Sequence, residues 1–221
     1  MHQTTITFSD LRLSQRDGHK LRGYFSQQFG EGSDLWHNHR ADGRPIYRYP
    51  LIQYKVLHQT PMLIGIGDGA PLLMQHFLEV QQLDIDGWVL PVLSKQINSR
   101  QLEVGVVAEV QHYRFVSPWF ALNQKNHSLY QAAATADERQ AILRRILISN
   151  ILSFFKGVGH WEDQPIQLEL DTLKPVKATF KNQSMLMFLG GFTANIVLPE
   201  YIGLGQSVSR GYGSIQPKEN H

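Results

Sequence analysis

In the first part of the chain, the spacing of apolar residues changes from a strand-like to a helix-like period. Residues 5–13 place apolar side chains mostly at every second position, which predicts a strand with an irregularity near Asp10. Over residues 19–29 the spacing becomes helical, and Gly30 follows as a typical helix stop. The apolar face of this predicted helix consists of Leu21, Tyr24, Phe25 and Phe29. We therefore expect a strand followed by a short helix.

Two β-rich stretches come next, residues 46–57 and 62–66, and the residues between them predict a hairpin turn. Residues 67–69 break the second strand, and residues 70–83 then have helical spacing. A further strand is predicted from Trp88. The order strand, helix, strand, strand, helix, strand predicts a ferredoxin-like arrangement up to about residue 95.

The second half of the chain predicts a similar but less regular order of strands and helices. Residues 104–122 are strand-rich with a break at Pro118, and Asp137 is the predicted N-cap of a long helix that ends near Phe155. No pattern indicates a second full helix. The strands predicted after the long helix are residues 166–170, 176–181, 185–188 and 192–197.

These patterns predict an α+β protein built from tandem ferredoxin-like (βαββαβ) halves. The expected domains are residues 1–98 and 99–221, the second modified and mostly β with one long helix. An apolar content of 42% in 221 residues is enough to form packed cores. Because the chain has no cysteine, disulfides and thiolate metal sites are excluded.

Other compositional features narrow the class of protein. No apolar run approaches the roughly 20 residues that span a bilayer, and the N-terminus lacks a secretion-signal layout. We therefore expect a soluble, cytoplasmic protein that does not engage a membrane. The net charge is only +2, but cations outnumber acids in the first quarter of the chain. That local excess suits an anionic ligand, although a solvated charged face would look the same.

The candidate chemistry is concentrated in the segment LWHNHRADGRPIYRYPLIQYK. His37 and His39 are one residue apart, so on an extended backbone they would project to the same side, and Tyr47 and Tyr49 repeat this spacing. Imidazole, phenol and guanidinium groups together can attract a phosphate and move a proton. The alternatives are a polar loop without chemistry for the histidines and core packing for Tyr49.

A second candidate lies near the C-terminus, in YIGLGQSVSRGYGSI. Gly203, Gly205, Gly211 and Gly213 surround Arg210, and a glycine-rich backbone can approach a phosphate closely. A dinucleotide-binding fingerprint is excluded because it must open a helix inside a βαβ unit, and too few residues follow. No Gly-Lys-Ser or Gly-Lys-Thr is present for a P-loop. The alternative is an irregular hairpin that closes the C-terminal sheet.

Taken together, HNHRADGRPIYRYPLIQYK, PMLIGIGDGA and LPEYIGLGQSVSRGYGSI resemble the CRISPR-associated endoribonucleases that cut repeat RNA, members of the RAMP superfamily. The resemblance covers both ends of the chain and is only general over residues 95–190. It implies ferredoxin-like folds, a glycine-rich C-terminal loop and one cut per repeat in precursor CRISPR RNA. The implied reaction uses the neighbouring 2′-hydroxyl as nucleophile, needs no metal or other cofactor, and leaves a 2′,3′-cyclic phosphate and a 5′-hydroxyl.

The resemblance also implies site residues. It assigns catalysis to His39 and Tyr47, with His37 as the alternative histidine, and a histidine can serve as base or acid near neutral pH. The predicted RNA-binding residues are Arg40, Arg48, Lys55, Gly203, Gly205, Arg210, Gly211 and Gly213. The implied partners are precursor and mature CRISPR repeat RNA, while binding to effector-complex subunits and a homodimer are left open.

Two other functions remain as alternatives. Related folds serve as non-catalytic RNA-binding subunits of effector complexes, which have no need of the histidine and tyrosine cluster. A metal-dependent enzyme could use His37 and His39 as ligands. The tripeptide His37-Asn38-His39 is not the HNH nuclease motif, which spreads its residues over a ββα unit. Trp119 and Phe120 could form a dimer surface, but core packing is the favoured interpretation.

Overall fold

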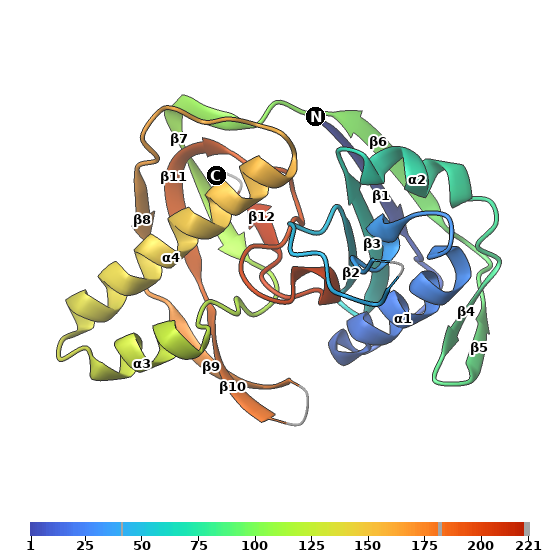
Figure 1. Ribbon diagram of the computed structural model, residues 1–221, viewed down its shortest axis with the longest axis horizontal. Helices are drawn as coiled ribbons and strands as arrows, with labels where there is room; N and C mark the ends of the chain where they lie inside the picture. The colour runs from blue at the N-terminus through green and yellow to red at the C-terminus, as the bar shows by residue number, and fades with distance from the viewer. Residues whose placement is uncertain (41, 181–182, 219–221) are drawn as a thin grey trace. The chain divides into compact units, whose positions relative to one another are not determined.

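The computed structural model describes residues 1–40, 42–180 and 183–218, drawn in Figure 1. The chain divides into two compact units. Unit 1 contains Met1–Glu103 together with Ser209–Gly211, and unit 2 contains Val104–Val208 together with Tyr212–His221. Among the described residues, no helix is both long enough and apolar enough to cross a membrane.

Unit 1 is a four-stranded antiparallel sheet with two α-helices packed on it (Figure 1). The strands of this sheet are β1 (His2–Thr7), β2 (Ile52–Leu57), β3 (Thr60–Ile66) and β6 (Gln96–Gln101), in the spatial order β2-β3-β1-β6. The helices are α1 (Gly18–Phe29) and α2 (Gly69–His76). Before β6, the strands β4 (Gln82–Ile85) and β5 (Trp88–Pro91) form a separate hairpin.

The core of unit 1 is built around Phe25 on α1. Its ring stacks on Trp36 and Tyr54, with centroids 6.2 and 5.8 Å away, and contacts Phe8 at 6.3 Å. The Tyr54 hydroxyl, which is buried with the ring, donates a hydrogen bond of 2.8 Å to the Trp36 carbonyl. Aromatic packing and this buried hydrogen bond fix the loop after α1 against β2. That loop carries the two histidines.

The hairpin and both helices predicted for this unit are confirmed, with different boundaries. The β2–β3 turn has only two residues, His58 and Gln59, both with positive φ (50° and 66°), the geometry that matches strand twist. Strand β2 begins at Ile52 because prolines at positions 45 and 50 interrupt the earlier residues. Helix α2 ends at His76, and Leu83 lies in β4 instead. Strand β1 likewise ends at Thr7.

Unit 2 has a second four-stranded antiparallel sheet. Its strands are β7 (Gly105–Phe115), β8 (Leu168–Leu170), β11 (Gly191–Val197) and β12 (Ile215–Pro217), in the spatial order β12-β7-β11-β8. Strands β9 (Lys174–Phe180) and β10 (Gln183–Leu189) pair separately. The helices α3 (Gln124–Ala132) and α4 (Ala136–Gly157) connect β7 to β8, and α4 packs against β8.

Two predictions for this unit were wrong. The N-cap of α4 is Thr135 rather than Asp137, because the Thr135 hydroxyl accepts from the Glu138 N–H at 3.2 Å in a capping box. Helix α3 was not expected, and none of its residues is buried, so it has no apolar stripe that could reveal it. Trp119 and Phe120 are buried, which confirms that they belong to the core.

The two sheets share one topology. If the four strands of each sheet are numbered in chain order, the spatial order in unit 1 is two, three, one, four. The order in unit 2 is the same read in reverse. In unit 1 the connection from the third to the fourth strand contains α2 and the β4–β5 hairpin. In unit 2 the same connection is the glycine-rich segment, residues 198–214, whose only regular element is the short η3 helix (Val208–Arg210). The chain passes from unit 1 to unit 2 after Glu103.

Candidate active site around His37 and His39

The loop that follows α1 is folded by its own side chains. Ser33 begins the 3₁₀ helix η2 (Asp34–Trp36), where its hydroxyl accepts from the Leu35 N–H at 3.3 Å. The Asn38 N–H then donates to the Asp34 carbonyl at 2.7 Å, and Asn38 has a φ of 54°. Asparagine tolerates this left-handed conformation better than most residues. The chain therefore turns at Asn38, and its backbone is not extended through His37 and His39.

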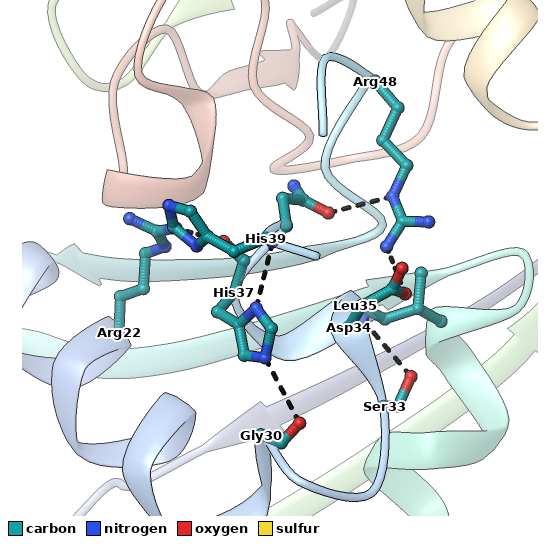
Figure 2. A network of polar contacts seen from close by, with 9 residues as sticks. Arg22, Gly30, Ser33, Asp34, Leu35, His37, His39 and Arg48 are labelled. Carbon is teal, nitrogen blue, oxygen red and sulfur yellow. Dashed lines mark hydrogen bonds and ion pairs between the residues drawn. The ribbon is translucent and has the colours of Figure 1, made fainter. Parts of the chain in front are cut away.

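The ring of His37 is held on both sides by main-chain groups (Figure 2). The His39 N–H donates to His37 Nδ1 at 3.0 Å, which requires an unprotonated Nδ1. The proton of the neutral ring then lies on Nε2, which faces the Gly30 carbonyl at 3.2 Å. A Cβ at Gly30 would lie 2.8 Å from His37 Cδ2, so the ring occupies space that only glycine leaves open. Both ring nitrogens of His37 are thus engaged in holding the loop.

His39 differs from its neighbour. Its main chain is fixed by the hydrogen bond to His37 and by an isolated bridge to Pro45. Its half-buried ring lies 5.6 Å from the His37 ring, measured between centroids. Within the part of the chain that the structure describes, no hydrogen bond occupies either ring nitrogen of His39. An imidazole without another hydrogen bond can accept or donate a proton without losing a contact.

Arg22 connects α1 to this loop. Its Nη2 donates a hydrogen bond to the His37 carbonyl, and Figure 2 shows its side chain reaching from the helix to the histidine loop. Burial lowers the pKa of Arg22 below its usual range, and the nearby Arg210 guanidinium lowers this pKa further. Arg22 is not among the site residues predicted from the sequence.

Arg210 belongs to unit 1 although it comes late in the chain. A Cβ at Gly18 would lie 2.7 Å from the Arg210 carbonyl oxygen, and one at Gly211 would lie 3.1 Å from the Tyr54 carbonyl oxygen. Gly211 also has a φ of +90°, which favours glycine. Residues Ser209–Gly211 therefore lie directly on the main chain of the first turn of α1 and of β2. Gly18 and Arg22 are one helical turn apart and face the same side.

The other glycines of the segment face protein atoms. A Cβ at Gly203 would lie 2.6 Å from Val208 Cγ1, and one at Gly205 would lie 2.8 Å from the Phe120 carbonyl oxygen. Gly213 has a φ of +64°, and its Cβ would collide with the Leu204 carbonyl. These glycines allow close packing of the main chain inside unit 2. Direct binding of RNA by Gly203, Gly205, Gly211 and Gly213 stays a prediction.

The tyrosines and arginines of the 40–50 region are not all near one another. Tyr47 is 95% exposed at the tip of a tight turn, closed by a 3.1 Å hydrogen bond from the Arg48 N–H to the Ile46 carbonyl. Tyr49 is buried, so its core role is confirmed and the predicted shared side of the two tyrosines was wrong. Arg48 pairs with Asp34 at 2.7 Å, away from His37 in Figure 2, and Arg40 is exposed.

Lys55 lies on β2 with its side chain completely buried. Burial lowers the pKa of Lys55 to about 7. A Cβ at Gly211 would lie 3.4 Å from Lys55 Cα, so the Ser209–Gly211 segment covers this part of the strand. In this conformation solvent does not reach the ammonium group. The predicted contact of Lys55 with RNA stays a prediction that requires this cover to move.

The site thus combines an uncommitted imidazole with two guanidinium groups that influence each other. Such a set can stabilise an anion and transfer a proton to or from a group bound beside it. Among the residues that the structure describes, there is no cluster of three or more histidine, aspartate and glutamate side chains arranged to hold a metal ion.

Two family models together match nearly the whole chain. A model of the Cas6b N-terminal domain matches residues 1–103, and a model of the Cas6b C-terminal domain matches residues 105–218. An uncharacterized protein of Methanocaldococcus jannaschii is 31% identical over 138 residues, which is 62% of this chain and 93% of that protein.

Solved structures give the same result for the fold. A crystal structure of Cas6b is 34% identical and superposes with a TM-score of 0.92 over 98% of this chain and 99% of its own. The crystal structure of the CRISPR RNA processing endoribonuclease Cas6b is 31% identical, with a TM-score of 0.78 over 99% and 100% of the two chains. A Cas6 product complex at 12% identity and a TM-score of 0.65, covering 99% of each chain, shares the fold alone.

Proposed function

The chain belongs to the Cas6b family, whose models match residues 1–103 and 105–218, and from this premise we infer that it is an endoribonuclease that processes CRISPR RNA. Its substrate is precursor CRISPR RNA, which it cuts within the repeats to release mature guide RNAs. We further propose that both units are variants of the ferredoxin-like arrangement, the second with the glycine-rich segment in place of a second helix.

The proposed reaction needs no metal ion. The 2′-oxygen of one ribose attacks the adjacent phosphorus, the bond from phosphorus to the 5′-oxygen breaks, and a 2′,3′-cyclic phosphate forms. The proton of the 2′-hydroxyl goes to a base, and the leaving 5′-oxygen receives a proton to become a hydroxyl. Cations near the phosphate stabilise the charge that accumulates in the transition state.

We assign the proton transfer to His39 and a positioning role to His37. The observation that carries this assignment is the pair of hydrogen bonds on the His37 ring, to the His39 N–H and the Gly30 carbonyl. If His37 acted as a base or an acid, it would have to release a contact that shapes the loop. His39 can exchange a proton without such a loss, and the His37 ring fixes the peptide that carries it.

The remaining predicted residues have supporting roles in this proposal. Tyr47 is fully extended into solvent, from which it could position or protonate bound RNA. Arg40 and Arg48 supply positive charge at the rim of the same loop, with Arg48 already paired to Asp34. Arg210 and the glycines around it would contact the RNA backbone.

One assay tests the proposed function. Purified protein is incubated with repeat RNA in excess EDTA, beside the same RNA with a single 2′-deoxyribose at the cut position. We expect cleavage in EDTA, a 2′,3′-cyclic phosphate on the upstream product, and no cleavage of the 2′-deoxy substrate. A His127→Ala variant, altered on the exposed α3 helix, serves as the control for protein quality and should cleave normally.

The two alternative functions predict different results in this assay. Salt-sensitive binding of the RNA without cleavage would indicate a non-catalytic RNA-binding subunit of an effector complex. Cleavage that EDTA abolishes and that added divalent metal restores would indicate a metal-dependent enzyme and would overturn the assignment of His39.

A further inference from the structure

Arg22 and Arg210 form a cationic pair next to the histidine loop. Arg210 comes from the segment Ser209–Gly211, whose main chain lies on Gly18, and Arg22 follows one helical turn later on the same face of α1. Each guanidinium carries a permanent positive charge. The Arg210 charge is close enough to lower the pKa of Arg22, and an anion bound by both guanidinium groups would offset their repulsion.

The position of Arg22 ties this pair to the proposed catalytic residue. One of its N–H groups donates to the His37 carbonyl, and the ring of the same His37 accepts from the His39 N–H. An arginine has five N–H donors, so the others remain able to form a two-point contact with a phosphate. Among the described residues, the Arg22 side chain forms a hydrogen bond to the His37 carbonyl and no ion pair with an acid.

We propose that Arg22 and Arg210 bind one and the same phosphate group of the RNA backbone, and that Arg22 is a positioning residue that fixes this phosphate relative to His39. The inference rests on the proposed function, because it takes RNA as the ligand. The fork of a guanidinium is required at position 22, since one edge must hold the His37 carbonyl while the other holds the phosphate.

The test uses repeat RNA that carries a 2′-deoxyribose at the cut position and a neutral methylphosphonate at one linkage at a time. Affinity is measured for the wild-type protein, Arg22→Gln, Arg210→Gln and a control, Arg16→Gln, which removes an exposed charge of the same unit. At one linkage the methylphosphonate should weaken wild-type binding by about tenfold, the scale of one charge-assisted contact. At that linkage the methylphosphonate should not weaken binding further in Arg22→Gln or Arg210→Gln. In Arg16→Gln it should weaken binding as much as in the wild type.

A second measurement separates positioning from folding. Arg22→Lys keeps the charge but not the fork, so it should retain most of the affinity while the single-turnover cleavage rate at saturating RNA falls about tenfold or more. Thermal unfolding of each variant identifies any that has lost its fold.

Several results would overturn the proposal. The first is that Arg22→Gln and Arg210→Gln each abolish the methylphosphonate effect, but at two different linkages. The second is that the methylphosphonate weakens binding in both variants as much as in the wild type. The third is that Arg22→Lys cleaves at the wild-type rate. The proposed function fails separately, if unmodified RNA is not cut in EDTA. A wild-type protein that does not bind repeat RNA would remove both.

Discussion

The two units have the same order of strands, but the loops that join these strands differ. In each unit, the second strand of the sheet follows a helix, and a loop joins the two: α1 to β2 in unit 1, and α4 to β8 in unit 2. In unit 1 this loop carries His37 and His39, and in unit 2 it carries His160. His160 Nε2 lies 3.1 Å from the Glu162 carboxylate, and this hydrogen bond is the main cause that lowers the pKa of Glu162. The histidine of unit 2 is therefore committed to an acid, whereas the His39 ring is not.

The connection between the third and fourth strands differs as well. Unit 1 uses a helix and a hairpin, which complete its own layer structure. Unit 2 uses the glycine-rich segment, and three of its residues, Ser209–Gly211, cluster with unit 1. The same order of strands thus supports different loops in equivalent positions, and in the proposed function the histidine loop of unit 1 takes part in the reaction while that of unit 2 does not.

The largest expected effect distinguishes the two histidine loops. His39→Ala should lower the cleavage rate by about 10²- to 10⁴-fold, the usual contribution of a general acid or base, with RNA affinity retained. His160→Ala should change the rate less than tenfold, because its ring is bonded to Glu162 and packs on Phe155 and so has a structural role. Single-turnover rates and binding constants measured on both variants check this. Equal losses of rate would mean that the comparison between the loops is wrong.

A glycine in the histidine loop offers the next test. A Cβ at Gly30 would collide with the Ser26 carbonyl and lie 2.8 Å from His37 Cδ2, so Gly30→Ala should displace the His37 ring. We expect a loss of about 1–3 kcal/mol in the free energy of unfolding, the cost of overpacking. The cleavage rate should fall by about tenfold or more.

Gly32→Ala is the matched control, because its Cβ would be at an ordinary 3.6 Å from the Phe29 carbonyl. Denaturant unfolding and single-turnover cleavage are measured for both variants. If Gly30→Ala keeps wild-type activity, His37 does not position His39.

The buried lysine of unit 1 predicts a pH dependence of stability. Burial lowers the folded-state pKa of Lys55 to about 7, while the unfolded chain has the ordinary value near 10.5. Between these values the unfolded state binds more protons, so this group makes the free energy of unfolding rise with pH, by at most about 1.4 kcal/mol per pH unit.

Denaturant unfolding of the wild type and of Lys55→Met, measured from pH 7 to 10, checks this. Lys55→Met removes the titrating group at similar volume and should flatten the slope while raising stability near pH 7. An unchanged slope would show that Lys55 has an ordinary pKa in the folded protein.

The smallest expected effect concerns the exposed side of the histidine loop. Arg48 pairs with Asp34 at 2.7 Å, and both side chains are partly open to solvent. Arg48→Gln should therefore change the free energy of unfolding by about 0.2–1 kcal/mol. Its effect on RNA affinity should weaken as the salt concentration rises. A loss of several kcal/mol in thermal or denaturant unfolding would show that this ion pair, and not the His37 ring, holds the loop.

Much of the fold could be predicted because apolar periodicity reports burial. Helices α1 and α2 and strands β1 to β3 of unit 1 follow that pattern, as does α4 in unit 2, and the pairing of β2 with β3 follows from adjacency in the chain. The fourth strand of the first sheet was expected from Trp88, but it is β6, whose residues are all exposed and so have no apolar pattern. Helix α3 was missed because it buries nothing, and the cap of α4 was misplaced by two residues since both Thr135 and Asp137 are good caps.

The site was predictable in its residue types and less so in its geometry. The sequence brings His37 and His39 together, but only the folded loop distinguishes the held ring from the uncommitted one. Arg22 was missed because its partner Arg210 is far away in the chain. Burial of Lys55 was not foreseen for the same reason, since Gly211 covers its strand. Long-range packing of this kind leaves no local signal in the sequence.

The central claim is that His39 transfers the proton and that His37 only positions it. Chemical rescue tests it most directly, because free imidazole can replace a missing general acid or base but not a missing positioning ring. Single-turnover cleavage of repeat RNA in EDTA is measured for His39→Ala and His37→Ala as imidazole is added. We expect imidazole to restore cleavage in His39→Ala, in proportion to its concentration, and to have no effect on His37→Ala. Rescue of His37→Ala alone would contradict the account.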